Sequence, residues 1–389
     1  MWPGTMKEIR LLIAGGGTGG HLFPGIAIAE ELSSLCPLHV KWIGTGRPVE
    51  QRVLSERPWQ YQVLRVRPFK GRNLGGLLAA VLTLPVSIVR AMVAIRRFKA
   101  DIVLGVGGYV SGPVLLAGKI LRIPTAIHEQ NYLPGLANRL AARFADRVYT
   151  SFQGSARYFK NKKIECLGNP IRRQILKDAL DLSNRVDPYR QFRILVLGGS
   201  QGATGLNRIV SSALKILHQS GLKFQVIHQT GPSERDVISA SYKSSGMNVK
   251  VEPFIERIGI AYSWADLIIC RAGATTLAEI TAVGKPAICI PFPYAADGHQ
   301  DLNARTLCEA GAALCFNERD LGAVALASNI EALMNDPARL VEMGKRSKGL
   351  GKPDAAKEIA LSMLRLCNCD SEIFSDVREM EGEQLKGHV

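Results

Sequence analysis

Residues 10–21 read RLLIAGGGTGGH, an apolar run followed by a loop with five glycines in six positions and then a histidine. The apolar run is too short to span a bilayer and is typical of a buried strand. Pro24 and the apolar residues at helical spacing after it predict a helix, with Pro24 in its first turn. Gly15, Gly17 and Gly20 fit G-x-G-x-x-G, in which backbone N–H groups and a helix N-terminus can hold a diphosphate. A tight turn without a ligand is the alternative for an isolated match.

A second copy of this pattern begins at residue 193. Residues 193–203 read RILVLGGSQGA and align without a gap on residues 10–20, with Gly198 on Gly15. Internal similarity over so long a period predicts two comparable domains, each opening with a strand and a phosphate-type loop. The length of 389 residues suits two α/β domains with sizeable cores.

Apolar runs alternate with helical patterns in both halves, which predicts parallel sheets covered by helices on both faces. After the opening strand, the predicted strands are Val40–Gly44, Tyr61–Val66, Ile102–Val106, Thr125–His128, Phe192–Leu197, Phe224–His228, Val249–Glu252, Leu267–Cys270, Ala287–Pro291 and Ala312–Phe316. The turn-rich Gly168-Asn169-Pro170 separates the halves and is the expected hinge. Residues 370–389 carry many acids and few apolar anchors, so a poorly ordered tail is expected there.

The composition indicates the compartment. No charged segment followed by an apolar segment opens the chain, so no secretory signal is expected. The eight cysteines contain no C-x-x-C pair, and Cys270, Cys289 and Cys315 fall in predicted core strands. We interpret the cysteines as reduced thiols of a cytoplasmic protein, without a disulfide framework or a metal site.

The net charge of +15 is unevenly distributed. From Arg57 to Lys99 the sequence has nine basic residues and no acidic one. Within this block, residues 77–95 are nearly long enough to span a bilayer, but Pro85 and Arg90 interrupt them. A helix packed on the sheet and a helix that also lies on an anionic membrane both fit this pattern. Nucleic-acid binding is not expected, because leucine and valine stand where a nucleic-acid groove would interleave aromatic residues.

Two more stretches carry candidate site residues. Residues 104–113, LGVGGYVSGP, form a second glycine loop between a strand and a helix, where an anion-binding loop and a tight turn are both possible. Residues 271–303 include Gly273–Thr276, a predicted helix start capped by hydroxyls, with Glu279 on the first turns. A carboxylate there can accept hydrogen bonds from both ribose hydroxyls while the helix N-terminus faces phosphate. The alternative for Glu279 is a solvated helix position.

Up to about residue 365, the chain resembles the family of transferases that add N-acetylglucosamine to lipid I, the undecaprenyl-diphosphate muramoyl-pentapeptide of peptidoglycan synthesis. The motifs that carry the resemblance are GGGTGGHLFPGIAIAEEL, GVGGYVSGP, IHEQNYLPGLANR, GNPIR, GGSQGA and RAGATTLAEI. The resemblance implies an α/β, glycosyltransferase B-type fold, with two facing Rossmann-like domains, parallel sheets and a cleft between them. It also implies an inverting UDP-N-acetylglucosamine-dependent hexosyltransferase that makes lipid II without a cofactor, peripheral on the cytoplasmic face of the cell membrane.

The resemblance also implies a domain layout and a set of partners. The expected segments are an acceptor and membrane-side domain at 1–167, a hinge at 168–172, a UDP-sugar domain at 173–352 and a helix at 353–369 that returns to the first domain. The acidic tail at 370–389 lies outside the resemblance. The expected partners are UDP-N-acetylglucosamine, lipid I, anionic membrane lipids and other cell-wall synthesis proteins, with no nucleic acid.

The family's site residues carry over position by position. Donor-binding roles fall on Thr18, Gly19, Gly20, Asn131, Arg172, Ser200, Ile255, Ala274, Thr275, Thr276, Leu277, Ala278, Glu279 and Gln300. Acceptor-binding roles fall on Gly17, Gly108, Tyr109 and Ser111. Independently of the family, the basic and apolar block predicts membrane contact at Lys70, Arg72, Leu77, Leu78, Leu82, Arg96 and Arg97. The sequence has no D-x-D motif, so helix dipoles and Arg172 are expected to take the leaving charge without a protein-bound metal.

His21 is the candidate catalytic base, because imidazole exchanges protons near neutral pH. A role in capping the loop or binding phosphate is the alternative for this residue. Two other functions stay open on the glycine loops and the basic block alone. A dinucleotide-dependent oxidoreductase would need an acid where the second strand ends, but the sequence there is Ile43-Gly44-Thr45-Gly46-Arg47. A non-catalytic membrane-associated adaptor would leave both nucleotide-type loops without a role.

Overall fold

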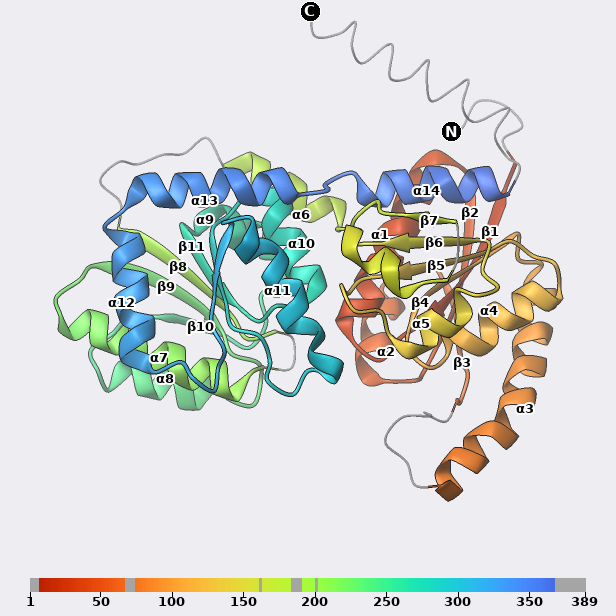
Figure 1. The fold of residues 1–389 in the computed structure, drawn as a ribbon, viewed down its shortest axis with the longest axis horizontal. Helices are drawn as coiled ribbons and strands as arrows, with labels where there is room; N and C mark the ends of the chain where they lie inside the picture. The colour runs from red at the N-terminus through yellow and green to blue at the C-terminus, as the bar shows by residue number, and fades with distance from the viewer. Residues whose placement is uncertain (1–6, 67–73, 161–162, 183–190, 200–201, 368–389) are drawn as a thin grey trace, which may run out of the picture. The chain divides into compact units, whose positions relative to one another are not determined.

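The computed structural model describes residues 7–66, 74–160, 163–182, 191–199 and 202–367 (Figure 1). These residues form two compact units, and the chain passes between them after Ile171 and again after Pro353. The first unit therefore combines the N-terminal part of the chain with the described residues from Asp354 onward. The tail expected at 370–389 lies outside the described residues.

The described part of the first unit contains a seven-stranded parallel sheet with the order β3-β2-β1-β4-β5-β6-β7. Its strands are β1 (Ile9–Gly15), β2 (Leu38–Gly44), β3 (Gln60–Val63), β4 (Ile102–Gly107), β5 (Thr125–Glu129), β6 (Arg147–Thr150) and β7 (Ile164–Glu165). The order of the strands reverses between β1 and β4. Loops leave the carboxyl ends of these two strands in opposite directions, and ligands of doubly wound sheets bind at such a switch point.

Helices cover both faces of this sheet because neighbouring residues of a buried parallel strand point to opposite sides. Leu11 and Ile13 of β1 belong to one core, and Leu12 and Ala14 belong to the other. The first core includes side chains from α1 (Gly19–Leu35), α2 (Pro48–Ser55) and α14 (Ala355–Leu366). The second core includes side chains from α3 (Leu74–Phe98), α4 (Ser111–Ile120) and α5 (Leu136–Ala141).

Three details of the first unit concern its helices. α14 packs against α1, and the Tyr149 hydroxyl donates to Ser362 Oγ at 3.0 Å, which attaches the end of the described chain to the first sheet. The prediction that Pro24 lies in the first helical turn is wrong, because α1 already begins at Gly19 and Pro24 lies inside it. A proline so near the N-terminus removes only one helical hydrogen bond, which the helix tolerates. A short 3-10 helix, η1 (Gln153–Tyr158), follows β6.

The second unit repeats the pattern with six described parallel strands in the order β10-β9-β8-β11-β12-β13. The strands are β8 (Phe192–Leu197), β9 (Phe224–Gln229), β10 (Lys250–Glu252), β11 (Leu267–Cys270), β12 (Ala287–Cys289) and β13 (Ala313–Cys315). The switch point lies between β8 and β11, at the position that matches β1 and β4 in the first unit.

The helices of the second unit also lie on both faces of its sheet. One core joins Ile194 and Val196 of β8 to α7 (Thr204–Gln219), α8 (Arg235–Lys243), α12 (Ala323–Met334) and α13 (Pro337–Leu350). The other helices are α6 (Arg173–Leu182), α9 (Ile258–Trp264), α10 (Ala274–Val283) and α11 (His299–Glu309), with the 3-10 turn η2 (Ala296–Gly298) before α11. α6 packs against α9, and α9 contacts β8.

The expectation of reduced cysteines throughout is wrong at one place. Cys308 and Cys315 form a disulfide between the end of α11 and β13. The two residues are seven positions apart, a spacing that matches no familiar pair motif, and the turn from helix to strand brings their Cα atoms to 6.2 Å. Cys270 and Cys289 are free and buried.

Candidate active site

The loops after β1, β4 and β5 meet at the carboxyl edge of the first sheet, beside the switch point. The glycines of the second loop allow this close approach. A Cβ on Gly108 would lie 2.9 Å from the Gly16 carbonyl oxygen, and a Cβ on Gly107 would lie 2.6 Å from His21 Nδ1. Both glycines also have positive φ, +106° and +81° for Gly107 and Gly108, which other residues rarely adopt. The stretch LGVGGYVSGP therefore packs the two glycine loops together.

Ser111, an expected acceptor-binding residue, is fully buried between the same loops. Its Oγ lies 2.7 Å from the Ala14 carbonyl oxygen and 2.8 Å from the Gly107 carbonyl oxygen, and it accepts the Gly107 N–H at 3.1 Å. The Ser111 hydroxyl thus joins β1 to β4. The side chain of Tyr109, in contrast, is 45% exposed at this edge.

A buried carboxylate anchors the first glycine loop. Glu50, at the start of α2, accepts the Gly17 N–H at 2.6 Å, the Thr45 N–H at 2.7 Å and the Tyr61 hydroxyl at 2.9 Å. Burial alone would raise the pKa of Glu50, but the hydrogen bonds from Thr45, Tyr61 and Gly17 outweigh it and hold the pKa below its ordinary value. Because the Gly17 N–H is bonded to Glu50, the loop turns its helix start, rather than Gly17, toward any anion.

That helix start holds Thr18, Gly19 and Gly20, which the family resemblance implies as donor contacts. Thr18 is the N-cap of α1, with extended backbone, and its side chain makes no capping hydrogen bond. No acid lies in the first turn of α1. An N-terminus without a carboxylate cap keeps its positive electrostatic potential for an anionic ligand.

His21 follows on the first turn of α1 and is half-buried against the second loop. Its Nδ1 lies 3.0 Å from Oε1 of Gln130, which comes directly after β5. Asn131 is next to Gln130, and the buried carboxylate of Glu129 accepts the Asn131 N–H at 2.9 Å. The other Glu129 oxygen accepts the Gly135 N–H and the Asn138 amide, so one acid fixes the whole loop after β5.

In the second unit, α10 begins directly after β11 at the carboxyl edge of the sheet. The N-cap of α10 is not one of the expected hydroxyl residues. The N-cap is Gly273, with extended backbone and no side-chain capping bond, and Thr275 and Thr276 lie within the helix. Glycine is an accepted N-cap residue because extended backbone costs it little. The residues from Ala274 to Glu279, expected at the donor, thus form the first one and a half turns of α10.

Glu279 is buried, so the alternative of a solvated helix position is wrong. The Tyr262 hydroxyl donates to Glu279 Oε2 at 2.7 Å, and Arg172 Nη2 lies 4.0 Å from Oε1. Burial raises the pKa of Glu279, and the nearby Arg172 charge and the Tyr262 hydrogen bond only partly oppose it. Since Tyr262 occupies one carboxylate oxygen, the other is the one directed at Arg172.

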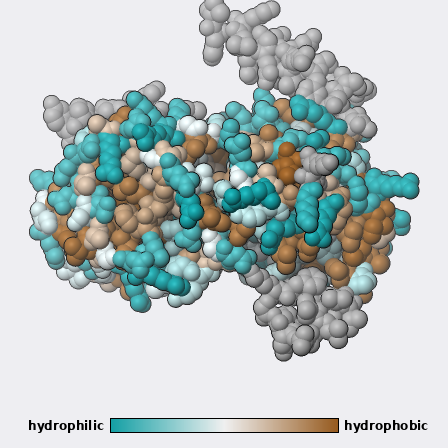
Figure 2. All heavy atoms as spheres, viewed as in Figure 1, coloured by the Kyte–Doolittle hydropathy of each residue, from teal (hydrophilic) through white to brown (hydrophobic). Residues whose placement is uncertain are grey.

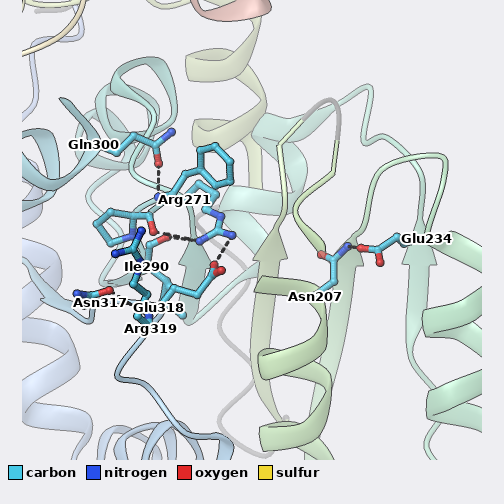
Figure 3. Close-up of polar contacts among 10 residues, drawn as sticks. Asn207, Glu234, Arg271, Ile290, Gln300, Asn317, Glu318 and Arg319 are labelled. Atoms are coloured by element: carbon cyan, nitrogen blue, oxygen red, sulfur yellow. Dashed lines mark hydrogen bonds and ion pairs between the residues drawn. The ribbon is translucent and has the colours of Figure 1, made fainter. Parts of the chain in front are cut away.

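Ile255 and Gln300 are held by hydrogen bonds of their own. The Ile255 N–H donates to Gln229 Oε1 at 3.0 Å, which leaves the Ile255 carbonyl for a ligand. Gln300 Oε1 accepts the Phe292 N–H at 2.9 Å, so its amide nitrogen is the group that can donate to a ligand (Figure 3). Ser200 lies outside the described residues.

Arg271, which sequence reasoning did not single out as a site residue, organises the loops around Gln300. Its Nη1 donates to the carbonyl oxygens of Ile290 and Pro291 at 3.0 and 3.1 Å, and its Nη2 pairs with Glu318 (Figure 3). The guanidinium also stacks over the Phe292 ring at 5.5 Å. Arg271 could have been identified as a site residue from its position directly after the predicted strand Leu267–Cys270.

Comparisons with known proteins agree in both units. Residues 11–150 match the model of the glycosyltransferase family 28 N-terminal domain, and residues 193–359 match that of the C-terminal domain. The chain is 43% identical over 353 residues to the UDP-N-acetylglucosamine--N-acetylmuramyl-(pentapeptide) pyrophosphoryl-undecaprenol N-acetylglucosamine transferase of Anaeromyxobacter dehalogenans strain 2CP-1, covering 90% of this chain and 91% of that one. It is 44% identical to the protein of the same name from Syntrophus aciditrophicus, covering 92% of this chain and 99% of that one. The crystal structure of Acinetobacter baumannii MurG superposes with a TM-score of 0.75 at 31% identity, over 92% of this chain and 99% of that one.

The chain belongs to the MurG family. Its fold is therefore the glycosyltransferase B-type fold of MurG, α/β with two parallel sheets, as predicted from the sequence. A UDP-N-acetylglucosamine 2-epimerase of Neisseria meningitidis, solved with UDP-GlcNAc, shares this fold with a TM-score of 0.64 at 17% identity. Membership in the MurG family makes the chain a UDP-N-acetylglucosamine-dependent glycosyltransferase, and the oxidoreductase and adaptor alternatives fall away.

Several residues of this MurG-family site were not among the sequence-based candidates. They are Glu50, His128, Glu129, Gln130, Tyr262 and Arg271. Three of the six share a detectable signal, because His128, Glu129 and Gln130 are polar residues at the end of a predicted buried strand. The motif IHEQNYLPGLANR was recognised, but its order along the chain does not say which of its side chains reaches His21.

Proposed function

We propose that the first unit binds lipid I and supplies His21 as the general base, and that the second unit binds UDP-N-acetylglucosamine. Transfer of N-acetylglucosamine to the C4 hydroxyl of the muramoyl sugar of lipid I then gives lipid II. The observation that carries this proposal is the setting of His21, where two glycine loops and the loop after β5 converge on one side chain in a chain of the MurG family.

The proposed chemistry is a single inverting displacement. His21 accepts the proton of the C4 hydroxyl as the hydroxyl oxygen attacks the anomeric carbon of the donor. The new carbon–oxygen bond forms opposite the bond to UDP, and the electron pair of the broken bond leaves with the diphosphate. The proton rests on the His21 imidazole and passes to water before the next turnover.

The second unit supplies the groups that suit the donor. The N-terminus of α10 has no side-chain cap and offers backbone N–H groups and a positive dipole for a diphosphate. Glu279 Oε1, which lies 4.0 Å from Arg172 Nη2, is the carboxylate oxygen proposed to accept from the ribose hydroxyls, and the Ile255 carbonyl suits the uracil edge. We assign the developing charge on UDP to the α10 N-terminus and Arg172, without a protein-bound metal. Asn131 and Gln300 are proposed to hold the sugar hydroxyls.

Replacing His21 tests the base role. In His21→Ala, turnover of lipid I or a water-soluble analogue should fall by about 100-fold or more, because the proton then has no acceptor. UDP affinity should stay nearly unchanged, since the proposed UDP contacts belong mainly to the second unit. His39→Ala is the matched control, because His39 is an exposed histidine of the same unit. Unchanged turnover in His21→Ala would remove His21 from the base role.

We also propose that α3 lies on the anionic, cytoplasmic face of the cell membrane. In the described part of α3, Val86, Val89 and Val93 are 52%, 58% and 44% exposed and fall on one helical face. Arg90, Arg96 and Arg97 are exposed nearby. Figure 2 shows apolar residues gathered where α3 and α4 lie. Lys70 and Arg72 lie outside the described residues, as do the side chains of Leu77, Leu78 and Leu82.

Exposed valines beside arginines suit shallow insertion with the cations at anionic head groups, each worth about 1 kcal/mol near the surface. Arg97 also lies near Lys41. Burial lowers the pKa of Lys41, and the positive charge of Arg97 lowers it further. Over the part of the chain that the structure describes, no helix is long and apolar enough to cross a membrane. Attachment through this surface would be reversible and sensitive to salt.

Charge reversal separates membrane attachment from chemistry. Arg96→Glu with Arg97→Glu should reduce co-sedimentation with anionic vesicles by roughly 10-fold and lower activity on lipid-embedded acceptor, because two cations become anions. Activity on a water-soluble short-chain analogue should stay within about 2-fold of wild type. Arg235→Glu with Lys243→Glu, on exposed α8, changes the net charge equally and is the matched control. Equal loss on both acceptors would show that the arginines serve the fold or the active site.

A further inference from the structure

A continuous row of hydrogen bonds runs from His21 into the core of the first unit. His21 Nδ1 lies 3.0 Å from Gln130 Oε1, and Gln130 Nε2 lies 2.9 Å from the Val106 carbonyl oxygen and 3.1 Å from His128 Nδ1. His128 Nε2 lies 3.2 Å from the Gly168 carbonyl oxygen. His128 and Gln130 are almost fully buried, so water cannot replace these partners. The row therefore has one consistent set of proton positions.

The proton positions follow from the buried end of the row. A carbonyl oxygen only accepts, so the Gly168 carbonyl requires a proton on His128 Nε2. Burial lowers the pKa of His128 to about 4, and this residue is therefore neutral near neutral pH. A neutral imidazole carries one proton, and His128 Nδ1 is consequently an acceptor.

The hydrogen bonds of Gln130 determine which nitrogen of His21 carries the proton. Two acceptors, the Val106 carbonyl and His128 Nδ1, face one end of the Gln130 side chain, so that end must be the NH₂ group. A flipped amide would set its oxygen against both acceptors and leave the amide protons toward His21. The Gln130 oxygen therefore faces His21, and His21 Nδ1 must donate to it.

We propose that Gln130, itself oriented by His128, is a positioning residue that holds His21 as the Nδ1–H tautomer. The lone pair of His21 then lies on Nε2, the ring nitrogen that no other residue engages among the described hydrogen bonds. Gly107 supports the same ring orientation, because its missing Cβ gives the imidazole room beside Nδ1 and Cε1. This inference rests on the proposed base role of His21, and it identifies Nε2 as the atom that takes the acceptor proton.

An amide at this position differs physically from a carboxylate. A carboxylate partner would also stabilise the protonated imidazole by a full charge, as in the triad of serine hydrolases. Gln130 fixes the tautomer and the ring direction without a charge, and the buried neutral His128 adds none. The residue therefore acts on which nitrogen is the base.

The tautomer of the wild-type protein is measured directly by two-bond nitrogen–proton correlation spectra of protein labelled with ¹⁵N-histidine. The His21 signals are assigned from their loss in His21→Ala. We expect a protonated Nδ1 and an unprotonated Nε2. A protonated Nε2 in the wild-type protein would overturn the proposal, and this measurement depends neither on activity nor on the folding of a variant at Gln130.

Gln130→Met keeps the side-chain length and removes the amide. We expect His21 to take up the Nε2–H form in part, and kcat to fall about 10- to 100-fold, with KM for UDP-N-acetylglucosamine within about 2-fold. His128→Phe keeps a ring but removes the acceptor for Gln130, and a smaller change in the same direction is expected. Gln153→Met, at an exposed position of the same unit, is the matched control. An unchanged tautomer or an unchanged kcat in Gln130→Met would refute the positioning role.

The two proposals fail in different ways. If His21→Ala keeps full activity, the base role is lost whatever tautomer the spectra show. If His21→Ala is inactive but the tautomer does not depend on Gln130, the base role stands and the positioning role is lost.

Discussion

The two strand–loop–helix stretches that open the units share a reciprocal pair of hydrogen bonds between an arginine and an aspartate at the start of their central strand. We call this pair the clamp. In the first unit, the Arg10 N–H donates to Asp101 Oδ2 at 2.8 Å and the Asp101 N–H donates to the Arg10 carbonyl at 2.9 Å. In the second unit, the Arg193 N–H and Asp266 make the same reciprocal pair, with both distances 2.9 Å. The aligned arginines thus mark equivalent positions, each beside the strand across the switch point.

Among the described residues, the contacts at the other end of the strand differ between the two stretches. Both units have an acid at the start of the helix after the neighbouring strand. Glu50 is buried and takes a backbone N–H of the loop itself, from Gly17. Glu234 is half-buried and takes the side-chain amide of Asn207, on the helix after the loop, at 2.7 Å (Figure 3).

The two units thus share the hydrogen bonds at the start of the central strand and differ in the described contact of the acid near its end. Backbone anchoring fixes the first loop beside His21, where a catalytic side chain needs a defined position. Side-chain anchoring in the second unit fixes the helix, and buried His228 completes it with a 3.2 Å contact to Asn207 Oδ1 and a 2.9 Å contact to the Tyr242 hydroxyl. Each unit thus uses one buried histidine beside an amide, and the amide contacts a half-buried side chain, His21 in the first unit and Glu234 in the second.

Removing the two acids should give unequal losses of stability. Glu50→Ala leaves several buried donors without an acceptor, so we expect the free energy of unfolding of the first unit to fall by about 3 kcal/mol. Glu234→Ala removes one main side-chain partner, and about 1 kcal/mol is expected for the second unit. Urea titration followed by hydrogen exchange of peptides from each unit measures both. Equal losses would contradict the distinction between the two anchors.

The effect of Glu50 should also depend on pH. Its pKa in the folded protein is held below the ordinary value of 4.5, so its stabilisation is present above that value and is lost as pH falls through the lowered pKa. The stability difference between wild type and Glu50→Ala should therefore be full near neutral pH and shrink in acid. A difference that stays constant into acid would show that Glu50 acts through packing alone.

Removing the Tyr262 hydroxyl should weaken donor binding moderately. In Tyr262→Phe, Glu279 loses a hydrogen bond that lowers its pKa, so its charged form becomes less favourable and less fixed. We expect KM for UDP-N-acetylglucosamine to rise about 5-fold, roughly 1 kcal/mol, with kcat within about 2-fold. Tyr242→Phe is the matched control, because that buried tyrosine contacts His228 instead. A rise in KM of the same size in the control would mean that the effect is one of folding.

The smallest effects are expected at the shared clamp. Asp101→Ala and Asp266→Ala each remove one half-buried acceptor from a backbone N–H, and each should destabilise its own unit by about 0.5 kcal/mol, because water can partly replace a half-buried partner. The same exchange measurement compares the two variants. Losses that differ by more than about 2-fold would show that the two clamps are alike only in geometry.

The fold was largely predictable because buried parallel strands have continuous apolar runs in their sequence. Phe192–Leu197 and Leu267–Cys270 match β8 and β11 at both ends, and other predicted strands differ by a few residues at their ends. β6 and β7 were not predicted, since four and two residues carry too little pattern. The start of α1 was placed late because proline is an ambiguous marker of the first turn.

The site was predictable only in part, because several of its contacts join residues far apart in the chain. His21 and Gln130 are 109 residues apart, and Gly17 and Glu50 are 33 apart. Ser111 was selected for its place in a motif, but its hydroxyl bonds to Ala14, 97 residues away, and is buried. Motif membership identifies residues near a site without separating those that face a ligand from those that hold the loops.

The sequence by itself determined two α/β units, their opening loops and the family, because apolar periodicity, glycine spacing and motifs are properties of order along the chain. Only the tertiary structure decided which partner each polar group has. The parallel sheet brings the ends of β1, β4 and β5 to one edge, and burial there forces each donor to find an acceptor. The tautomer inferred for His21 follows from that requirement, since it depends on a carbonyl at Gly168 that contacts His128 rather than His21 itself.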